Sequence, residues 1–138
     1  MAEKRLVLSD SSPLIALAAA GGFGLLRELF GVVSVTRPVR DEVLAGGEKA
    51  GATDLRRVLG AALASGGDCY LLIDDESARR EARARGLEFA GTLGVLIVAK
   101  HRGFIPAVRP FLARLVEYGF HLSPELGQSV LVEAGEHR

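Results

Sequence analysis

The chain has 138 residues, of which 49% are hydrophobic and 25% are charged, and its 17 basic and 17 acidic side chains leave no net charge. This composition excludes a disordered chain and predicts one globular domain with a buried core, which would need a local basic patch to bind nucleic acid. The single cysteine, Cys69, excludes a disulfide framework or a thiolate zinc site within one chain. We expect a cytoplasmic protein that does not enter a membrane, because no signal peptide or membrane-spanning stretch is evident.

Short apolar runs alternate with helix-like segments along the chain. Runs such as Leu6–Leu8 and Leu71–Ile73 lack polar alternation, which is typical of strands buried on both faces of a parallel sheet. Glycines and prolines mark the helix ends, and Pro110 predicts a kink or a late start in its helix. In chain order the pattern predicts strands at 6–9, 32–35, 69–73 and 87–90, and helices at 14–20, 23–30, 38–45, 54–65, 76–85, 93–101, 106–118 and 124–134. This alternation predicts an α/β fold, a three-layer sandwich with a mostly parallel central sheet.

Acidic residues follow three of these predicted strands. Asp10 comes directly after the first strand, and Asp74 and Asp75 come after the third. Glu42 lies one turn into the helix after the second strand. The carboxyl ends of parallel strands line the crevice where ligands bind, and clustered carboxylates are typical ligands of a hard divalent cation. The alternative is that each Asp caps the helix after it and that Glu42 is a solvated acid that offsets the helix dipole.

A basic helix begins just after this acidic pair. It carries Arg79, Arg80 and Arg83, whose side chains would reach phosphates near the acids. The alternative is a solvated helix face, since arginine is a good helix former.

The order and spacing of six motifs resemble those of the PIN-domain proteins. They resemble most a prokaryotic branch of predicted nucleic-acid-binding members related to the VapC-type toxins. The resemblance covers nearly the whole chain except about 47–68. The motifs are Ser9-Asp10-Ser11-Ser12-Pro13-Leu14-Ile15, Pro38-Val39-Arg40-Asp41-Glu42-Val43, Leu71-Leu72-Ile73-Asp74-Asp75, Gly91-Thr92-Leu93-Gly94-Val95-Leu96, Gly103-Phe104-Ile105-Pro106 and Gly119-Phe120-His121-Leu122-Ser123-Pro124-Glu125-Leu126.

The resemblance implies a ribonuclease of PIN or toxin type that depends on Mg²⁺ or Mn²⁺. Asp10, Glu42 and Asp74 would match the catalytic, metal-binding acids, with Asp75 beside them, and Ser11 would match a supporting hydroxyl next to the first acid. The resemblance further implies RNA as substrate, an antitoxin-type protein partner and a homo-oligomer.

The chain departs from this branch in its middle. Members usually carry a further strand and a helix with a Gly-Glu-Ala-type motif that supplies another metal-site acid. Here residues 47–68 hold a compact loop and one helix, so the chain resembles a single PIN-like domain, 1–138, that is shortened in this stretch. Asp54 lies about one helical turn from the expected acid, and Glu48 is a weaker substitute. Two functions follow: metal-dependent cleavage of RNA, or a degenerate, non-catalytic scaffold that binds nucleic acid or a protein.

Overall fold

The predicted α/β fold with a parallel central sheet is confirmed. The computed structural model shows a three-stranded parallel sheet and eight helices within the part of the chain that it describes. None of these helices is long and apolar enough to cross a membrane. The description covers residues 5–45, 53–66 and 68–136, apart from the side chains of 53–56.

The chain forms two compact units. The first comprises residues 1–15 and 32–91, and the second comprises residues 16–31 and 92–138. Each unit therefore draws on two separate stretches of the chain. That the whole chain acts as a single, shortened domain stays a prediction.

The first unit holds the sheet. Its strands are β1 (Leu6–Ser9), β2 (Cys69–Leu72) and β3 (Glu88–Ala90), in the order β1-β2-β3. Both pairings are parallel, and Ser9 and Ala90 both pair with Leu72. Most apolar side chains of β1 and β2 are almost completely buried, and Leu6 and Tyr70 are half-buried, which explains why these strands lack polar alternation.

The second predicted strand, at 32–35, is wrong. Within this segment only Ser34 forms a bridge, parallel to Leu8. The Ser34 amide donates to the Val7 carbonyl at 2.7 Å, and the Ser9 amide donates to the Ser34 carbonyl at 3.0 Å. Val32 is 71% exposed. The β propensity of a residue mainly reflects how it packs against its neighbours. The β-branched segment 32–35 lacks such packing at its exposed end and therefore makes one bridge and no strand.

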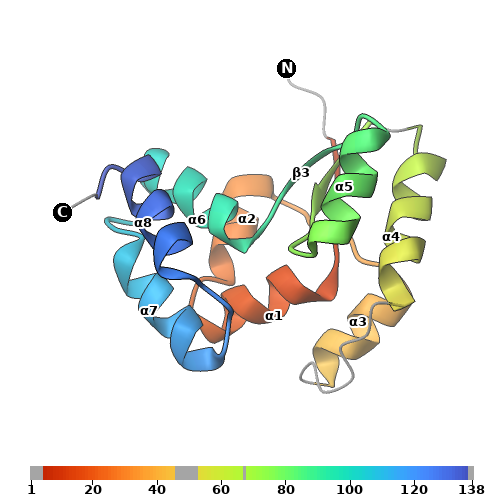
Figure 1. Cartoon of the computed structure of the whole chain (residues 1–138). Coiled ribbons are helices and arrows are strands. Elements are labelled where there is room, and N and C mark those ends of the chain that lie inside the picture. The colour runs from red at the N-terminus through yellow and green to blue at the C-terminus, as the bar shows by residue number, and fades with distance from the viewer. Residues whose placement is uncertain (1–4, 46–52, 67, 137–138) are drawn as a thin grey trace. The chain divides into compact units, whose positions relative to one another are not determined.

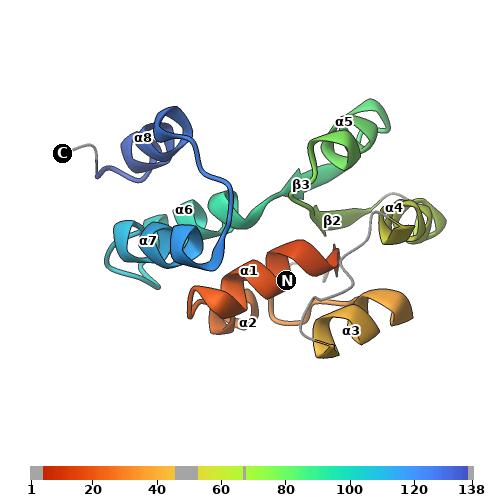
Figure 2. The ribbon, with the colours of Figure 1, turned by 60° about the horizontal axis from the view of Figure 1, so that its bottom comes forward.

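Helices cover the sheet of the first unit. Helix α4 (Thr53–Ala64) contacts β1, and α5 (Glu76–Ala84) contacts both β3 and α4 (Figures 1 and 2). Helix α3 (Arg37–Leu44) has Pro38 in its first turn, as predicted. Helix α1 (Ser11–Ala19) starts three residues earlier than predicted, directly after Asp10, and the boundary between the units falls within it.

The second unit is helical (Figure 1). Helix α6 (Thr92–His101) contacts α2 (Gly24–Phe30) and α8 (Pro124–Glu133). Helix α7 (Arg109–Tyr118) starts late, with Pro110 in its first turn, which is one of the two outcomes expected for this proline. The start of α8 is fixed by the Ser123 side chain, which accepts a hydrogen bond from the backbone amide of Leu126 at 3.1 Å.

Glu136 links the segments that follow α6 and α8. Its carboxylate accepts hydrogen bonds from the backbone amides of Val108 at 2.6 Å and Arg109 at 3.2 Å, and it pairs with Nζ of Lys100 at 3.1 Å. Burial opposes ionisation of this side chain, but the Val108 amide, Lys100 and the Arg109 amide together hold the pKa of Glu136 below its ordinary value. The ionised form is therefore the one that the fold stabilises.

Replacing Glu136 by Gln tests this linkage. A pKa lowered in the folded state contributes stability above the pKa of the unfolded chain, and this contribution disappears as the pH falls through the folded-state pKa. We expect Glu136→Gln to lower the free energy of unfolding by about 1.5–3 kcal/mol at neutral pH and by much less in acid. Urea unfolding across this pH range measures the difference, with Glu117→Gln, on the exposed face of α7, as the control. Equal pH profiles for the two variants would contradict the prediction.

Candidate functional site

Asp10 and Asp74 lie at the same edge of the sheet. The Asp10 amide donates to the Leu72 carbonyl at 3.0 Å, and the Ile73 amide donates to the Ala90 carbonyl at 2.9 Å, so the parallel ladder continues for one residue beyond the strands. Asp10 therefore follows β1 at the edge where Asp74 follows β2. This is the placement that the alternation of strands and helices predicts, because parallel strands end at a common edge.

Glu42 is buried beside the residue that follows Asp10. Its Oε1 accepts a hydrogen bond from Oγ of Ser11 at 3.0 Å. Glu42 and Asp10 are each 7% exposed, and Val39, one turn before Glu42 on α3, is fully buried. The burial of Glu42 contradicts the solvated-acid alternative. An ionised carboxylate is costly to bury unless hydrogen bonds or charges compensate for the lost water, and the Ser11 hydroxyl supplies one such bond.

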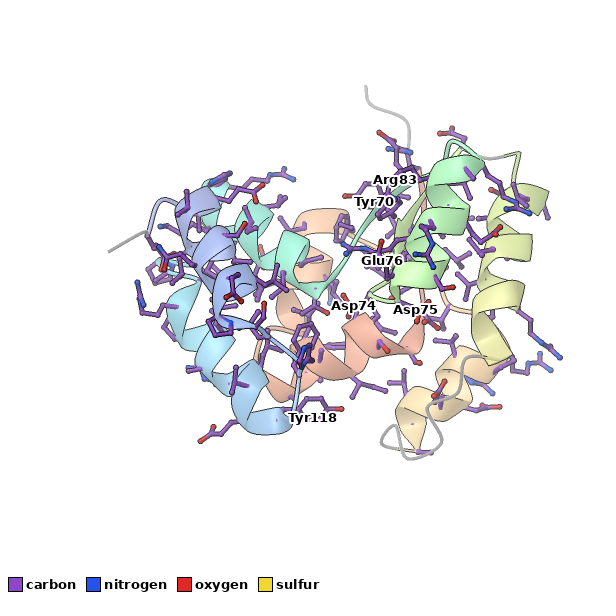
Figure 3. All side chains as sticks on the ribbon, in the orientation of Figure 1. Tyr70, Asp74, Asp75, Glu76, Arg83 and Tyr118 are labelled. Atoms are coloured by element: carbon purple, nitrogen blue, oxygen red, sulfur yellow. The ribbon has the colours of Figure 1, made fainter. Side chains whose placement is uncertain are left out.

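Asp75 has a structural role. Its Oδ2 accepts a hydrogen bond from the Ala78 amide at 2.9 Å, which makes it the N-cap of α5. Asp75 is exposed, whereas Asp74 is half-buried, and Figure 3 shows both at the start of α5. The capping alternative is thus observed for Asp75, and its role as a metal ligand stays a prediction.

The carboxylates are suitable ligands for a cation, but the described side chains do not form a complete set of metal ligands. Asp10, Glu42 and Asp74 supply the oxygen ligands that Mg²⁺ and Mn²⁺ prefer. Among the described side chains, however, no three from His, Cys, Asp or Glu are grouped so as to hold a metal ion. The two residues expected to replace the missing acid, Glu48 and the side chain of Asp54, lie outside the described residues. The donor chemistry fits a hard cation, and the identity of the full ligand set stays a prediction.

Gly91, directly after β3, lies against both a carboxylate and a guanidinium. A Cβ atom at this position would lie 2.5 Å from Oδ1 of Asp74, 3.0 Å from Nη2 of Arg79 and 3.3 Å from the carbonyl oxygen of Ile73. Any larger residue at this position would have to move the Asp74 carboxylate and crowd the Arg79 guanidinium. The sequence suggested that Arg79 could reach a phosphate, but it did not predict that Arg79 and Asp74 pack against Gly91. A glycine at the end of a strand often marks a close approach of this kind, and it was the one available signal.

The basic residues of α5 are not equivalent. The guanidinium carbons of Arg79 and Arg83 lie 5.4 Å and 5.3 Å from the centroid of the Phe89 ring. Arg79 is half-buried, whereas Arg80 and Arg83 are exposed. Nε of Arg79 is buried and has no hydrogen-bond partner among the described residues. Arg79 is therefore held by stacking on the ring at least as much as by hydrogen bonds.

Comparison with protein families identifies the fold. A family model described as a PIN domain matches residues 6–65 and 56–136 of the chain. The chain belongs to the PIN-domain family. The two matched stretches of this PIN domain overlap at residues 56–65, within the segment that the sequence predicts to be shortened. Neither the curated proteins nor the solved structures gave a match.

Family membership gives this PIN domain a nuclease-type fold. PIN domains generally depend on a divalent metal, which agrees with the oxygen donors at the carboxyl edge of the sheet. Membership in the VapC-like branch stays a prediction.

Replacing Gly91 by Ala tests the close packing around Asp74. The new methyl group would have to displace the Asp74 carboxylate or shift the end of β3, so we expect the free energy of unfolding to fall by about 1–3 kcal/mol. The control is Gly60→Ala in α4, where a Cβ meets nothing within 4 Å and should add about 0.5–1 kcal/mol through helix propensity. Denaturant unfolding compares the two variants. A Gly91→Ala variant as stable as the parent would show that the site is looser than described.

Proposed function

We propose that this PIN domain is a metal-dependent ribonuclease that hydrolyses RNA phosphodiesters. The observation that supports it most is the placement of the acids: Asp10 and Asp74 follow neighbouring parallel strands, and Glu42 is buried against Ser11. Carboxylates at the ligand-binding edge of a parallel sheet are suited to hold a cation, which would offset any repulsion between them.

Each residue has a distinct role in this proposal. Asp10, Glu42 and Asp74 would hold Mg²⁺ or Mn²⁺, which when bound supplies an activated water and polarises the phosphate. Ser11 orients the Glu42 carboxylate through its 3.0 Å hydrogen bond. Arg79, next to Asp74 at Gly91, lies where it would contact the negative charge of a phosphate.

A second function is favoured by one observation. Because the described side chains do not group three metal ligands, a non-catalytic PIN scaffold that binds nucleic acid or a protein is the alternative.

The resemblance to toxins extends the proposal to a cytoplasmic protein with an antitoxin-type partner and to a homo-oligomer. Exposed apolar side chains on the second unit, Val116, Tyr118 and Val132, supply apolar surface that such a contact would use.

Thermal unfolding with Mn²⁺ tests the metal site. A cation that binds only the folded state stabilises it, so millimolar Mn²⁺ should raise the Tm by about 5 °C. Asp10→Asn should lose this rise. Asp41→Asn is the control, because Asp41 is exposed on α3 and pairs with Arg40 at 3.2 Å, so its variant should respond to Mn²⁺ like the parent. A Tm that Mn²⁺ leaves unchanged in the parent counts against a metal site.

RNA cleavage tests the catalytic proposal and the role of Asp54. We expect weak, Mn²⁺-favoured cleavage of single-stranded RNA, because a three-acid site holds a hard cation loosely. Asp10→Asn should abolish cleavage at little cost to folding. If Asp54 supplies the missing ligand, Asp54→Asn abolishes cleavage too, and if Asp54 only starts α4, that variant cuts RNA like the parent. A parent that binds RNA or a protein but never cleaves RNA would establish the scaffold instead.

A further inference from the structure

We propose that Phe89 is a positioning residue that holds Arg79 and Arg83 as a binding site for two phosphates of a single-stranded RNA backbone. The inference rests on the proposed ribonuclease function and names how its substrate is held. It also divides the basic helix, since Arg80 has no part in this site.

The Phe89 ring fixes both guanidinium groups from the strand side. Phe89 is the central residue of β3, pairs with Leu71 of β2 and is half-buried, so the backbone of the sheet sets its position. Helix α5 contacts β3, and the guanidinium carbons of its Arg79 and Arg83 lie within 5.4 Å of the ring centroid. Stacking on an aromatic face removes rotamer freedom from a long side chain while leaving its N–H edge free to donate.

The arrangement places two like charges close together. Arg79 and Arg83 are four residues apart, on one face of α5, and share one ring. Two guanidinium groups at this spacing repel each other, and Asp74 lies beside only the first of them. Glu81, the acid nearest Arg83 in sequence, is paired with Arg85. A phosphate bound to each arginine would offset the repulsion, and a phosphodiester accepts two parallel hydrogen bonds from a guanidinium.

The two arginines also have an order relative to the carboxylates. Asp74 lies at the start of α5, and Figure 3 shows Arg83 toward the other end of the helix. Arg79 contacts the Gly91 position beside Asp74, and Arg83 lies about 6 Å farther along the helix axis. Arg79 would therefore hold the phosphate nearest the carboxylates and Arg83 the adjoining one. A flexible single strand suits this path, because the site contacts the backbone and offers no pattern for reading base edges.

Binding measured without cleavage tests the inference. The anisotropy of a short fluorescein-labelled oligouridylate is followed in EDTA at several KCl concentrations, for the full chain and its variants. We expect Arg79→Met and Arg83→Met each to raise Kd about tenfold and to reduce the salt slope by about 0.7, the value for one phosphate contact on a single strand. Phe89→Leu should weaken binding and reduce the slope although both arginines remain, and Phe89→Tyr, which keeps the ring, should bind like the parent.

Arg102→Met is the matched control. Arg102 also lies over a phenylalanine ring, 5.9 Å from the centroid of Phe104, but belongs to the second unit, so its loss changes the net charge equally and should leave Kd and slope unchanged. The inference is overturned if Arg79→Met and Arg83→Met keep the parent's slope, or if the parent does not bind the oligouridylate, even where RNA cleavage is measured. If both variants lose slope while the parent never cleaves RNA, the phosphate site stands and the ribonuclease proposal fails.

Discussion

Parallel pairing of three short strands determines where the chemistry of this PIN domain lies. Because β1, β2 and β3 run in one direction and pair in close register, the residues after each strand meet at one edge. Those residues are Asp10, Asp74 and Gly91. In an antiparallel arrangement the same sequence would place Asp10 and Asp74 at opposite edges, and neither Arg79 nor Glu42 would have a common site to contribute to.

Charged groups gather at this edge although the chain has no net charge. Asp10 and Glu42 are buried near the end of β1, and the guanidinium groups of Arg79 and Arg83 lie over the Phe89 ring of β3. The Asp74 carboxylate lies beside Arg79 at Gly91. A local cluster of charges can attract an ion even where the chain as a whole is neutral.

The sequence predicted the parts of the site that strands control. An apolar run followed by Asp is a local pattern, so the edge that carries Asp10 and Asp74 could be foreseen. The contact between Gly91, Asp74 and Arg79 could not, because it joins segments whose spacing depends on how α5 packs on β3. The strand predicted at 32–35 failed for a related reason: β propensity does not reveal whether a partner strand continues alongside. Asp75 shows a different limit of the sequence. An Asp directly before a helix can be either its N-cap or a metal ligand, and only the structure shows that Asp75 is the N-cap of α5.

Helix α4 shows how this segment can preserve the packing of the fold although the metal-site acid expected here is missing. The stretch shared by the two family matches, residues 56–65, lies in this helix, and its Val58 and Ala62 are completely buried. Since α4 contacts both β1 and α5, its apolar face supports the strand that leads to Asp10 and the helix that carries the arginines. Packing of this kind needs only aliphatic side chains at helical spacing. An acid on the same segment adds nothing to the packing, so losing it would leave the fold intact while weakening a metal site. The stability of the sheet is therefore no measure of a metal site, which would depend on the few carboxylates at its edge.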